Sequence, residues 1–304
     1  MSPASLRIGI RTGRLGQTLG ERISELLAPH VGASAITFVP IDPPASRGNG
    51  ASPWPGEALE RALTANEVDL AVLNAKDLGP ELASGLVLAA VTERVTPFDV
   101  LIARDEIIMD ELPEGAAVGA RTPIRRAQLL RYRDDLRIVE VPGSLDERIR
   151  MLEAGDVDGL VVSASAVEHL GFQDRVTEIF TTEVLVPAAG QGACAVLARQ
   201  RGKETLKLLH SLDQAMARAE LECERSFLRE LGADTAMAIG AIASMDDSTI
   251  RLEGVVADPD GRKVVRDVEE GPVGDETRVG ARLARRLLLE GAKRILAMTG
   301  SAAQ

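Results

Sequence analysis

The sequence predicts an α/β protein with two lobes of similar plan, each built on a mixed, mostly parallel sheet, and a small third domain of the α+β class. Three observations predict this fold class. Strand-like and helix-like segments alternate through the first two hundred residues, a block of the first lobe recurs in the second, and the pattern changes after residue 213. Alternating strands and helices are typical of βαβ units, whereas strands followed by a helix are typical of α+β domains.

The first hundred residues supply the alternation. Short apolar runs predict buried strands, and apolar residues three or four positions apart predict helices. The predicted strands are Leu6–Ile10, Ile36–Ile41, Leu70–Leu73 and Leu86–Val91, and the predicted helices are Leu15–Leu27 and Glu57–Ala65. The segment Asp42–Pro55 is rich in Pro, Ser and Gly and predicts a flexible loop.

An internal repeat predicts the second lobe. Ile8–Thr12 (IGIRT) is echoed by Val118–Thr122 (VGART), and Glu57–Asn74 (EALERALTANEVDLAVLN) is echoed by Asp146–Ser163 (DERIRMLEAGDVDGLVVS). A two-lobed α/β protein usually binds its ligand between the lobes, at the carboxyl ends of the strands. We therefore expect the site at that place.

The third segment differs in kind. A long helix is predicted over Asp213–Leu231, followed by strands over Ala238–Ala243, Thr249–Ala257 and Lys263–Val268 and a closing helix over Glu276–Ala297. This order predicts an antiparallel sheet covered by helices. We expect lobe 1 to comprise residues 1–96 and 192–214, lobe 2 residues 98–190, and the third domain residues 218–304.

Composition and charge exclude several classes. A net charge of −11 argues against a nucleic-acid partner, because such binding requires a basic surface, but it leaves room for a local cationic pocket. No apolar run reaches membrane-spanning length, and Met1–Arg11 has no apolar core of signal-peptide length. Two cysteines, Cys194 and Cys223, are too few for a disulfide framework, so we expect a reducing cytoplasm. Three scattered histidines predict no metal site.

The placement of arginines is the most informative local feature. Arg11 and Arg121 each follow a strand at a point where a helix begins, and helix N-termini attract anions. Further arginines near helix starts are Arg125, Arg126 and Arg148. Each one alone could equally be a solvated surface arginine. Together, at matching strand ends of both lobes, they predict a ligand with several carboxylates, because arginine pairs with carboxylates in bidentate geometry.

Three further features are candidates for chemistry. Lys76 and Asp77 follow the strand Leu70–Leu73, where an aspartate could hold a cationic nitrogen or move a proton, although a turn aspartate before Gly79 explains the sequence better. Gln191 lies between two glycines, which fits a close approach to ligand or a crossover between lobes. The segment lacks the third glycine of a dinucleotide fingerprint, so we expect no nucleotide. Cys194 lies in an apolar strand and Cys223 among carboxylates, which predicts unreactive thiols.

These landmarks together carry a family resemblance. The strand-end arginine, A-V-x-x-x-K-D, G-x-x-x-x-I-R-R, L-V-P-A-A-G-Q-G-A and E-R-x-F-L occur in this order over essentially the whole chain. In this set the chain resembles the porphobilinogen deaminases (hydroxymethylbilane synthases) of tetrapyrrole biosynthesis. The resemblance implies two lobes like those of periplasmic binding proteins and a monomeric enzyme that joins four porphobilinogen molecules head to tail with release of ammonia. It also implies a dipyrromethane primer, thioether-linked to a cysteine of the third domain.

The resemblance also implies roles for individual residues. Asp77 matches the catalytic aspartate, which holds pyrrole N–H groups and stabilises the cation left when ammonia departs. Gln191 matches a residue beside the primer. Residues that match the carboxylate-binding positions are Arg11, Lys76, Arg125, Arg126 and Arg148.

Other positions depart from the family pattern. Thr235 stands where the family has its primer-bearing cysteine, and a threonine hydroxyl is a far weaker nucleophile than a thiolate, so covalent attachment of the primer is not expected. Basic positions are also changed: Pro142 and His169 stand at two of them, and Ser52 and Glu57 lie near the lysines of the active-site lid, which shrinks to Asp42–Pro55.

Two functions follow from this combination. The chain could be a deaminase that holds its primer non-covalently or through Cys194. Alternatively, it could be a paralogue that binds porphobilinogen or another pyrrole or polycarboxylate ligand between the lobes and has lost chain elongation.

Overall fold

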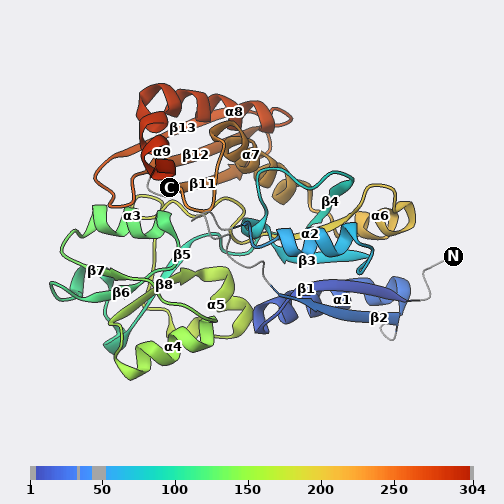
Figure 1. Cartoon of the computed structure of the whole chain (residues 1–304), viewed down its shortest axis with the longest axis horizontal. Coiled ribbons are helices and arrows are strands. Elements are labelled where there is room, and N and C mark those ends of the chain that lie inside the picture. The colour runs from blue at the N-terminus through green and yellow to red at the C-terminus, as the bar shows by residue number, and fades with distance from the viewer. Residues whose placement is uncertain (1–4, 33–34, 43–52, 302–304) are drawn as a thin grey trace.

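The computed structural model describes residues 5–32, 35–42 and 53–301. The predicted lid loop, with Ser52, falls almost wholly outside these residues. In Figure 1 the two lobes lie side by side and the third domain lies above them, with α3 (Pro123–Tyr132) of lobe 2 packed against β11 (Ala238–Met245) of the third domain. No helix among the described residues is long and apolar enough to cross a membrane.

Lobe 1 is a five-stranded sheet in the order β2-β1-β3-β10-β4. The strands are β1 (Leu6–Arg11), β2 (Ile36–Ile41), β3 (Leu70–Asn74), β4 (Leu86–Val91) and β10 (Cys194–Arg199), and the helices are α1 (Arg14–Val31), α2 (Glu57–Thr64) and α6 (Lys203–Leu209). The strands β1, β2 and β3 are parallel, whereas β10 lies antiparallel between β3 and β4. The sheet is therefore mixed, as predicted, with one inserted antiparallel strand returning from lobe 2.

The sheet of lobe 1 is buried on both faces. Along β3, Leu70 and Val72 point into the core under α1, and Ala71 and Leu73 point into the core under α2. Side chains of a strand alternate between faces, so a continuous apolar run is what a sheet covered on both sides requires.

Lobe 2 repeats this plan. Its sheet has the order β7-β6-β8-β5-β9, with β5 (Asp99–Ala103), β6 (Ala117–Gly119), β7 (Arg137–Val139), β8 (Gly159–Ser163) and β9 (Glu178–Ile179), and its helices are α3 (Pro123–Tyr132), α4 (Leu145–Ala154) and α5 (Ala164–Leu170). The strands β6, β7 and β8 are parallel, and β5 lies antiparallel between β8 and β9. The echoed sequence blocks thus occupy equivalent strands and helices in the two lobes.

The third domain is an antiparallel sheet of β11 (Ala238–Met245), β12 (Thr249–Ala257) and β13 (Val264–Pro272), covered by α7 (Ala215–Leu231) and α8 (Glu276–Leu287). The prediction of one unbroken closing helix is wrong. A π-helical turn over Leu288–Ala292 separates α8 from α9 (Lys293–Ser301), and Gly291 within it has φ +128°. Such a value is outside the helical range and is tolerated mainly by glycine, so the chain kinks there.

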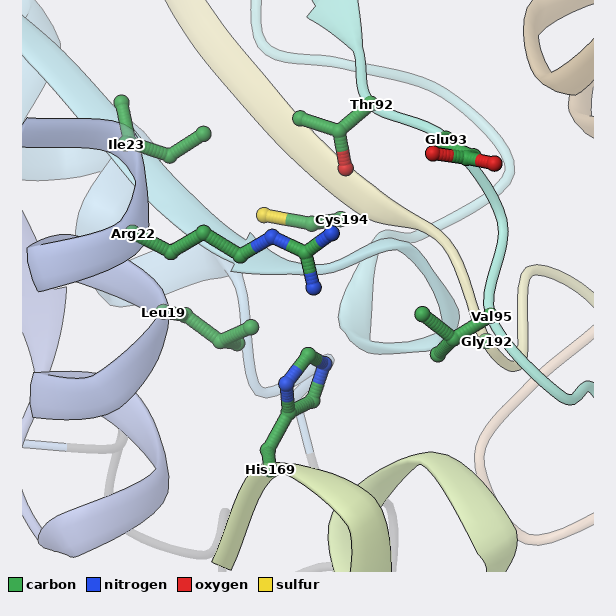
Figure 2. A pocket seen from close by; sticks show the side chains of 9 residues that line it. All are labelled: Leu19, Arg22, Ile23, Thr92, Glu93, Val95, His169, Gly192 and Cys194. Atoms are coloured by element: carbon green, nitrogen blue, oxygen red, sulfur yellow. The ribbon is translucent and has the colours of Figure 1, made fainter. Parts of the chain in front are cut away.

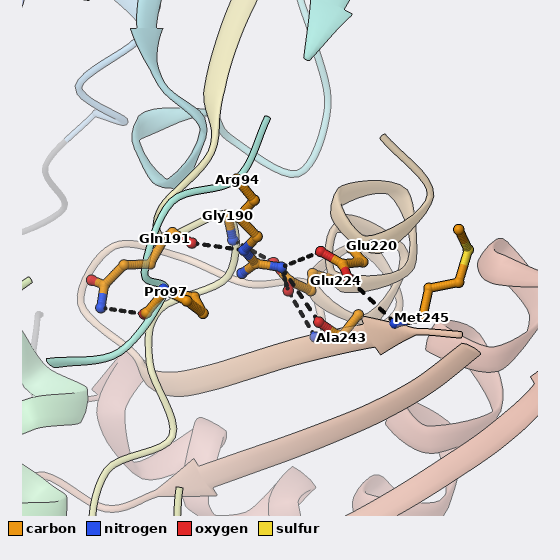
Figure 3. Close-up of polar contacts among 8 residues, drawn as sticks. All are labelled: Arg94, Pro97, Gly190, Gln191, Glu220, Glu224, Ala243 and Met245. Atoms are coloured by element: carbon orange, nitrogen blue, oxygen red, sulfur yellow. Dashed lines mark hydrogen bonds and ion pairs between the residues drawn. The ribbon is translucent and has the colours of Figure 1, made fainter. Parts of the chain in front are cut away.

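A buried ion pair joins the three parts (Figure 3). Arg94, on the segment that leads from β4 into lobe 2, donates from Nη1 to Oε1 of Glu224 on α7 at 2.7 Å. Its Nε donates to the carbonyl of Gln191 on the returning segment at 2.9 Å. The Glu224 carboxylate also accepts from the backbone N–H groups of Gly190 at 2.5 Å and Ala243 of β11 at 2.7 Å. Because Glu224 is fully buried, these donors compensate its lost hydration and hold the crossover in place.

Candidate functional site

The site begins at the carboxyl ends of β1 and β3. These parallel neighbours end at one edge of the sheet, so Arg11 at the end of β1 meets Asp77 in the short 3₁₀ turn Ala75–Asp77 that follows β3. The Nη1 atom of Arg11 lies 2.6 Å from Oδ2 of Asp77. The Nε atom of Arg11 is buried and has no hydrogen-bond partner. Asp77 therefore ends a turn and also presents a carboxylate held by an arginine.

The second part of the site is a buried network centred on Gln191. Its Oε1 accepts from Nζ of Lys76 at 3.0 Å and from Nη2 of Arg125 at 3.2 Å. Its Nε2 donates to the carbonyl of Pro97 at 2.8 Å and to Oδ1 of Asp99 at 2.7 Å, and Figure 3 shows the first of these two contacts. Lys76 belongs to lobe 1 and Arg125 to lobe 2, so one amide joins the lobes.

Sequence reasoning missed Asp99. It is 1% exposed, it begins β5, and its Oδ1 accepts from Nη2 of Arg125 at 2.7 Å. The one signal in the sequence is an aspartate placed at the head of an otherwise apolar strand. Arg125 reaches it from the first turn of α3, which Thr122 caps and Pro123 opens. Both residues favour a helix start, which fixes the direction of the Arg125 side chain.

The glycines around Gln191 allow close packing of the crossover. Gly190 and Gly192 have φ values of +79° and +87°. A Cβ atom at Gly190 would lie 2.7 Å from the backbone carbon of Ala75, and one at Gly192 would lie 2.5 Å from the carbonyl oxygen of Val95. Both approaches are to the protein's own backbone. The structure thus favours the crossover role over a close approach to ligand, and it brings Gln191 against the turn that carries Asp77.

Arg148 lies at the start of α4 and is 9% exposed. Ser144 and Glu147 form a capping box that starts this helix. The Nη2 atom of Arg148 donates to the carbonyl of Gly143 at 2.7 Å, and its Nε is buried without a partner. Burial, followed by the positive charges of Arg121 and Arg125, lowers the pKa of Arg148 to about 10. A buried guanidinium with an unused donor is placed to receive an anion.

Lys76 shares this electrostatic environment. Burial and then the charge of Arg125 lower its pKa to about 8, while Asp99 and Asp77 act in the opposite direction. The contacts and charge interactions above connect five cationic side chains with three carboxylates, a set with two positive charges in excess: Arg11, Lys76, Arg121, Arg125 and Arg148 against Asp77, Asp99 and Glu147. We name these eight residues the junction cluster. It concentrates positive charge locally, which the net charge of −11 conceals.

Arg126 is not part of this cluster. Its Nη1 donates to the carbonyl of Ile138 on β7 at 3.2 Å, and its Nη2 lies 3.5 Å from Oδ1 of Asp260 in the turn between β12 and β13. The structure thus places this guanidinium toward the third domain. Adjacent helix positions point about 100° apart, which separates Arg126 from Arg125 although they are neighbours in sequence.

Thr235 lies in the turn between α7 and β11. Its Oγ1 donates to Oδ1 of Asp234 at 3.3 Å, and the same oxygen accepts from the backbone N–H of Ala236 at 2.9 Å. The Asp234 side chain therefore forms a local Asx turn and the threonine hydroxyl is bonded to it.

Both cysteines are buried. Cys194 is 6% exposed at the start of β10 and lines a small cavity with Arg22 of α1, Thr92 and His169 of α5 (Figure 2). The cavity has a volume of about 10 Å³, room for one water molecule. Burial raises the pKa of the Cys194 thiol to about 12, and burial with the nearby Glu224 raises that of Cys223. Neither side chain presents a thiolate to a ligand.

Comparisons with known proteins identify the family of this chain. Residues 49–207 match the family model "Porphobilinogen deaminase, dipyromethane cofactor binding domain", and residues 219–289 match the model of the C-terminal domain of the same family. The chain is 42% identical to a porphobilinogen deaminase of Pelotomaculum thermopropionicum over 238 residues, covering 78% of this chain and 76% of that one. It is 35% identical to a porphobilinogen deaminase of Syntrophotalea carbinolica over 306 residues, covering 98% and 96%.

Among solved structures, the methionine-binding protein MetQ is similar over 69% of this chain and 90% of that chain, with 16% identity and a TM-score of 0.47. The two family models together cover residues 49–207 and 219–289, which include all of lobe 2, part of lobe 1 and most of the third domain. The chain belongs to the porphobilinogen deaminase family.

Proposed function

We propose that this chain binds porphobilinogen at the junction cluster, catalyses its deamination with Asp77, and joins four such units into hydroxymethylbilane. The observation that carries the proposal is the Arg11–Asp77 pair of 2.6 Å, at the edge of a cluster with two positive charges in excess. A pyrrole with acetate and propionate side chains needs cations for its carboxylates and one anion for the charge that develops on its ring.

The chemistry assigned to Asp77 is electrostatic. When the C–N bond of the protonated aminomethyl group breaks, its electron pair leaves with nitrogen as neutral ammonia. The lone pair of the pyrrole nitrogen then delocalises toward the reacting carbon, which leaves a conjugated cation. A carboxylate beside the pyrrole N–H accepts its hydrogen bond and stabilises that cation. The free ring carbon of a second pyrrole attacks the cationic carbon, forms the C–C bond and loses its ring proton. In the last round water adds to the remaining cationic carbon and loses a proton, which leaves the hydroxymethyl group.

The residues present do not fit a thioether-linked dipyrromethane. Thr235 stands at the attachment position, its hydroxyl is bonded to Asp234, and both cysteines of the chain are buried with raised pKa values. The unpartnered Nε atoms of Arg11 and Arg148 do fit carboxylates. We therefore infer that any primer is held by ion pairs alone.

The test is incubation of the purified chain with porphobilinogen, followed by assay of ammonia and of uroporphyrin after oxidation. We expect both ammonia and uroporphyrin, and we expect the intact mass of the protein to show no pyrrole adduct before or after turnover. In an Asp77→Asn variant we expect both products to form at least about 100-fold more slowly. Absence of ammonia release by the unaltered chain at saturating porphobilinogen would overturn the proposal.

Thr235 in place of the family's cysteine favours a second candidate, a paralogue that binds porphobilinogen without elongating it. Calorimetric binding of porphobilinogen without any ammonia release would establish this candidate. Production of bilane would exclude it.

A further inference from the structure

Asp99 is a buried carboxylate to which neither the sequence pattern nor the proposed chemistry gives a task. It lies on β5, the first strand of lobe 2, and its side chain is 2% exposed. Its Oδ1 receives two hydrogen bonds of 2.7 Å, from Arg125 and from Gln191. A buried carboxylate is costly unless it is paired and hydrogen-bonded, and here both conditions are met by residues of the site.

The contacts of Gln191 determine the orientation of its amide. Asp99 and the carbonyl of Pro97 are both acceptors, so the amide nitrogen must face them. The amide oxygen then faces Lys76 and Arg125, which are both donors. Without the Asp99 carboxylate, the amide nitrogen would keep one acceptor, and Arg125 would lose its ion pair.

We propose that Asp99 is a positioning residue, which fixes the Gln191 amide and the Arg125 guanidinium so that Lys76 from lobe 1 and Arg125 from lobe 2 meet one carboxylate-bearing ligand together. Asp99 touches neither ligand nor reacting atoms in this role. It acts through Gln191 and Arg125, and its negative charge offsets the repulsion between the neighbouring cations Lys76 and Arg125. The ligand in this statement rests on the proposed function, whereas the network itself does not.

The role has an electrostatic consequence at Lys76. The charged groups that influence this lysine are Asp77 on its own turn, Asp99 on β5, Arg125 on α3 and Arg148 on α4. The two carboxylates favour the ammonium form and the two guanidinium groups oppose it. Loss of the Asp99 charge removes one favourable interaction and leaves the repulsion from Arg125 uncompensated, so the ammonium of Lys76 becomes less stable.

The experiment follows Lys76 directly in the ligand-free protein. The chain has five lysines, at positions 76, 203, 207, 263 and 293, so an NMR titration of ¹³Cε-labelled lysine resolves few signals, and a Lys76→Arg variant assigns the one of interest. We expect a midpoint near the pKa of about 8 in the unaltered chain. In Asp99→Asn we expect that midpoint to fall by about one pH unit.

The matched control is Asp69→Asn. Asp69 lies in lobe 1, is part-buried, and also holds two arginines, Arg7 at 2.9 Å and Arg199 at 3.3 Å. This change removes a comparable ion pair remote from the network and is expected to leave the Lys76 midpoint in place. An unchanged midpoint in Asp99→Asn, or an equal shift in the control, would overturn the proposal.

A second measurement needs no variant. Gln191 is fully buried, and its side-chain amide protons bond to the buried carboxylate of Asp99 and to the part-buried carbonyl of Pro97, so they should exchange with solvent at least tenfold more slowly than those of the exposed Gln200. Equal exchange rates would contradict the proposal even if Asp99→Asn fails to fold. Both readouts are independent of porphobilinogen, so failure of the proposed function cannot be mistaken for failure of this inference.

Discussion

Lobe 1 and lobe 2 share one strand order, but the matched arginines at the carboxyl ends of β1 and β6, Arg11 and Arg121, lie in different environments. In lobe 1, Arg11 is paired with Asp77 at 2.6 Å. The repeat places Ala166 of lobe 2 opposite Asp77, and Arg121 is exposed. The same repeat matches Leu59 of α2 with Arg148 of α4. Leu59 is fully buried, whereas Arg148 has a buried Nε atom without a hydrogen-bond partner.

The difference separates two tasks on one scaffold. Lobe 1 presents a carboxylate held by an arginine, which suits stabilisation of a cation. Lobe 2 presents arginines, which suit binding of carboxylates. We infer that lobe 1 alone supplies the reacting carboxylate, whereas lobe 2 contributes only binding cations, which act together with Arg11 and Lys76 of lobe 1. Four substitutions, from the largest expected effect to the smallest, test this division.

Removal of the lobe 1 carboxylate should have the largest effect. Asp77→Asn keeps the shape of the side chain but removes its charge, so the developing cation loses its stabilising partner. We expect the rate of ammonia release from porphobilinogen to fall by about 100- to 10,000-fold. Binding should weaken much less. Asp69→Asn serves as control and should keep most activity, because that carboxylate pairs with Arg7 away from the junction cluster.

Replacement of Arg148 in lobe 2 by leucine, the residue found at the matching position 59 of lobe 1, should affect ligand affinity and thermal stability differently. In Arg148→Leu the ligand loses one charge-assisted hydrogen bond, worth ~1.5–3 kcal/mol, so affinity should fall about tenfold to hundredfold. The melting temperature should stay or rise, because a buried guanidinium with an unused donor gives way to an apolar side chain. Calorimetry and thermal unfolding measure the two quantities. Arg150→Leu, on the exposed side of the same helix, should change neither; a lower melting temperature in Arg148→Leu would contradict this division.

Lys76 should make both the affinity for carboxylates and the free energy of unfolding depend on pH. Its pKa is lowered to about 8 from 10.5, chiefly by burial, so binding of carboxylates should weaken as pH rises through 8 and the ammonium charge is lost. Between about pH 8 and 10.5 the unfolded chain holds the proton more often than the folded chain. The contribution of Lys76 to the free energy of unfolding therefore increases over that range and is constant below it. Denaturant unfolding at several pH values measures this slope, and Lys76→Met should reduce it.

Much of this site follows from local sequence, because the end of a parallel strand is where α/β proteins place functional groups. Lys76 and Asp77 could be placed at a strand end in this way, although the catalytic role of Asp77 came from the family resemblance. The repeat matched Arg121 to Arg11, and Arg148 was located by its position near a helix start. Asp99 could not, because its partners come from α3 and from the crossover at residue 191, which only the folded sheet brings beside β5. The direction of Arg126 also depends on a distant contact, with Asp260 in the third domain.

The closing helix is a second feature that local sequence could not predict, because its break depends on tertiary packing. Apolar spacing continues through residues 276–297, so periodicity alone predicts one helix. The break at Gly291 depends on the conformational freedom of one residue and on the packing of Ala292 and Ile295 against the core of the third domain. Local pattern carries no information about that packing.

The smallest effect should come from giving lobe 2 the carboxylate that it lacks. Ala166→Asp places an acid at the position that matches Asp77, and Arg121 stands at the position that matches Arg11. A partly exposed ion pair is worth ~0.2–1 kcal/mol, so partial neutralisation of the lobe 2 cations should weaken porphobilinogen binding by about two- to fivefold. The effect should diminish at high salt, because exposed charges are screened. Ala166→Asn, of equal size without the charge, should bind as the unaltered chain does, and equal weakening in both variants would mean that volume rather than charge is responsible.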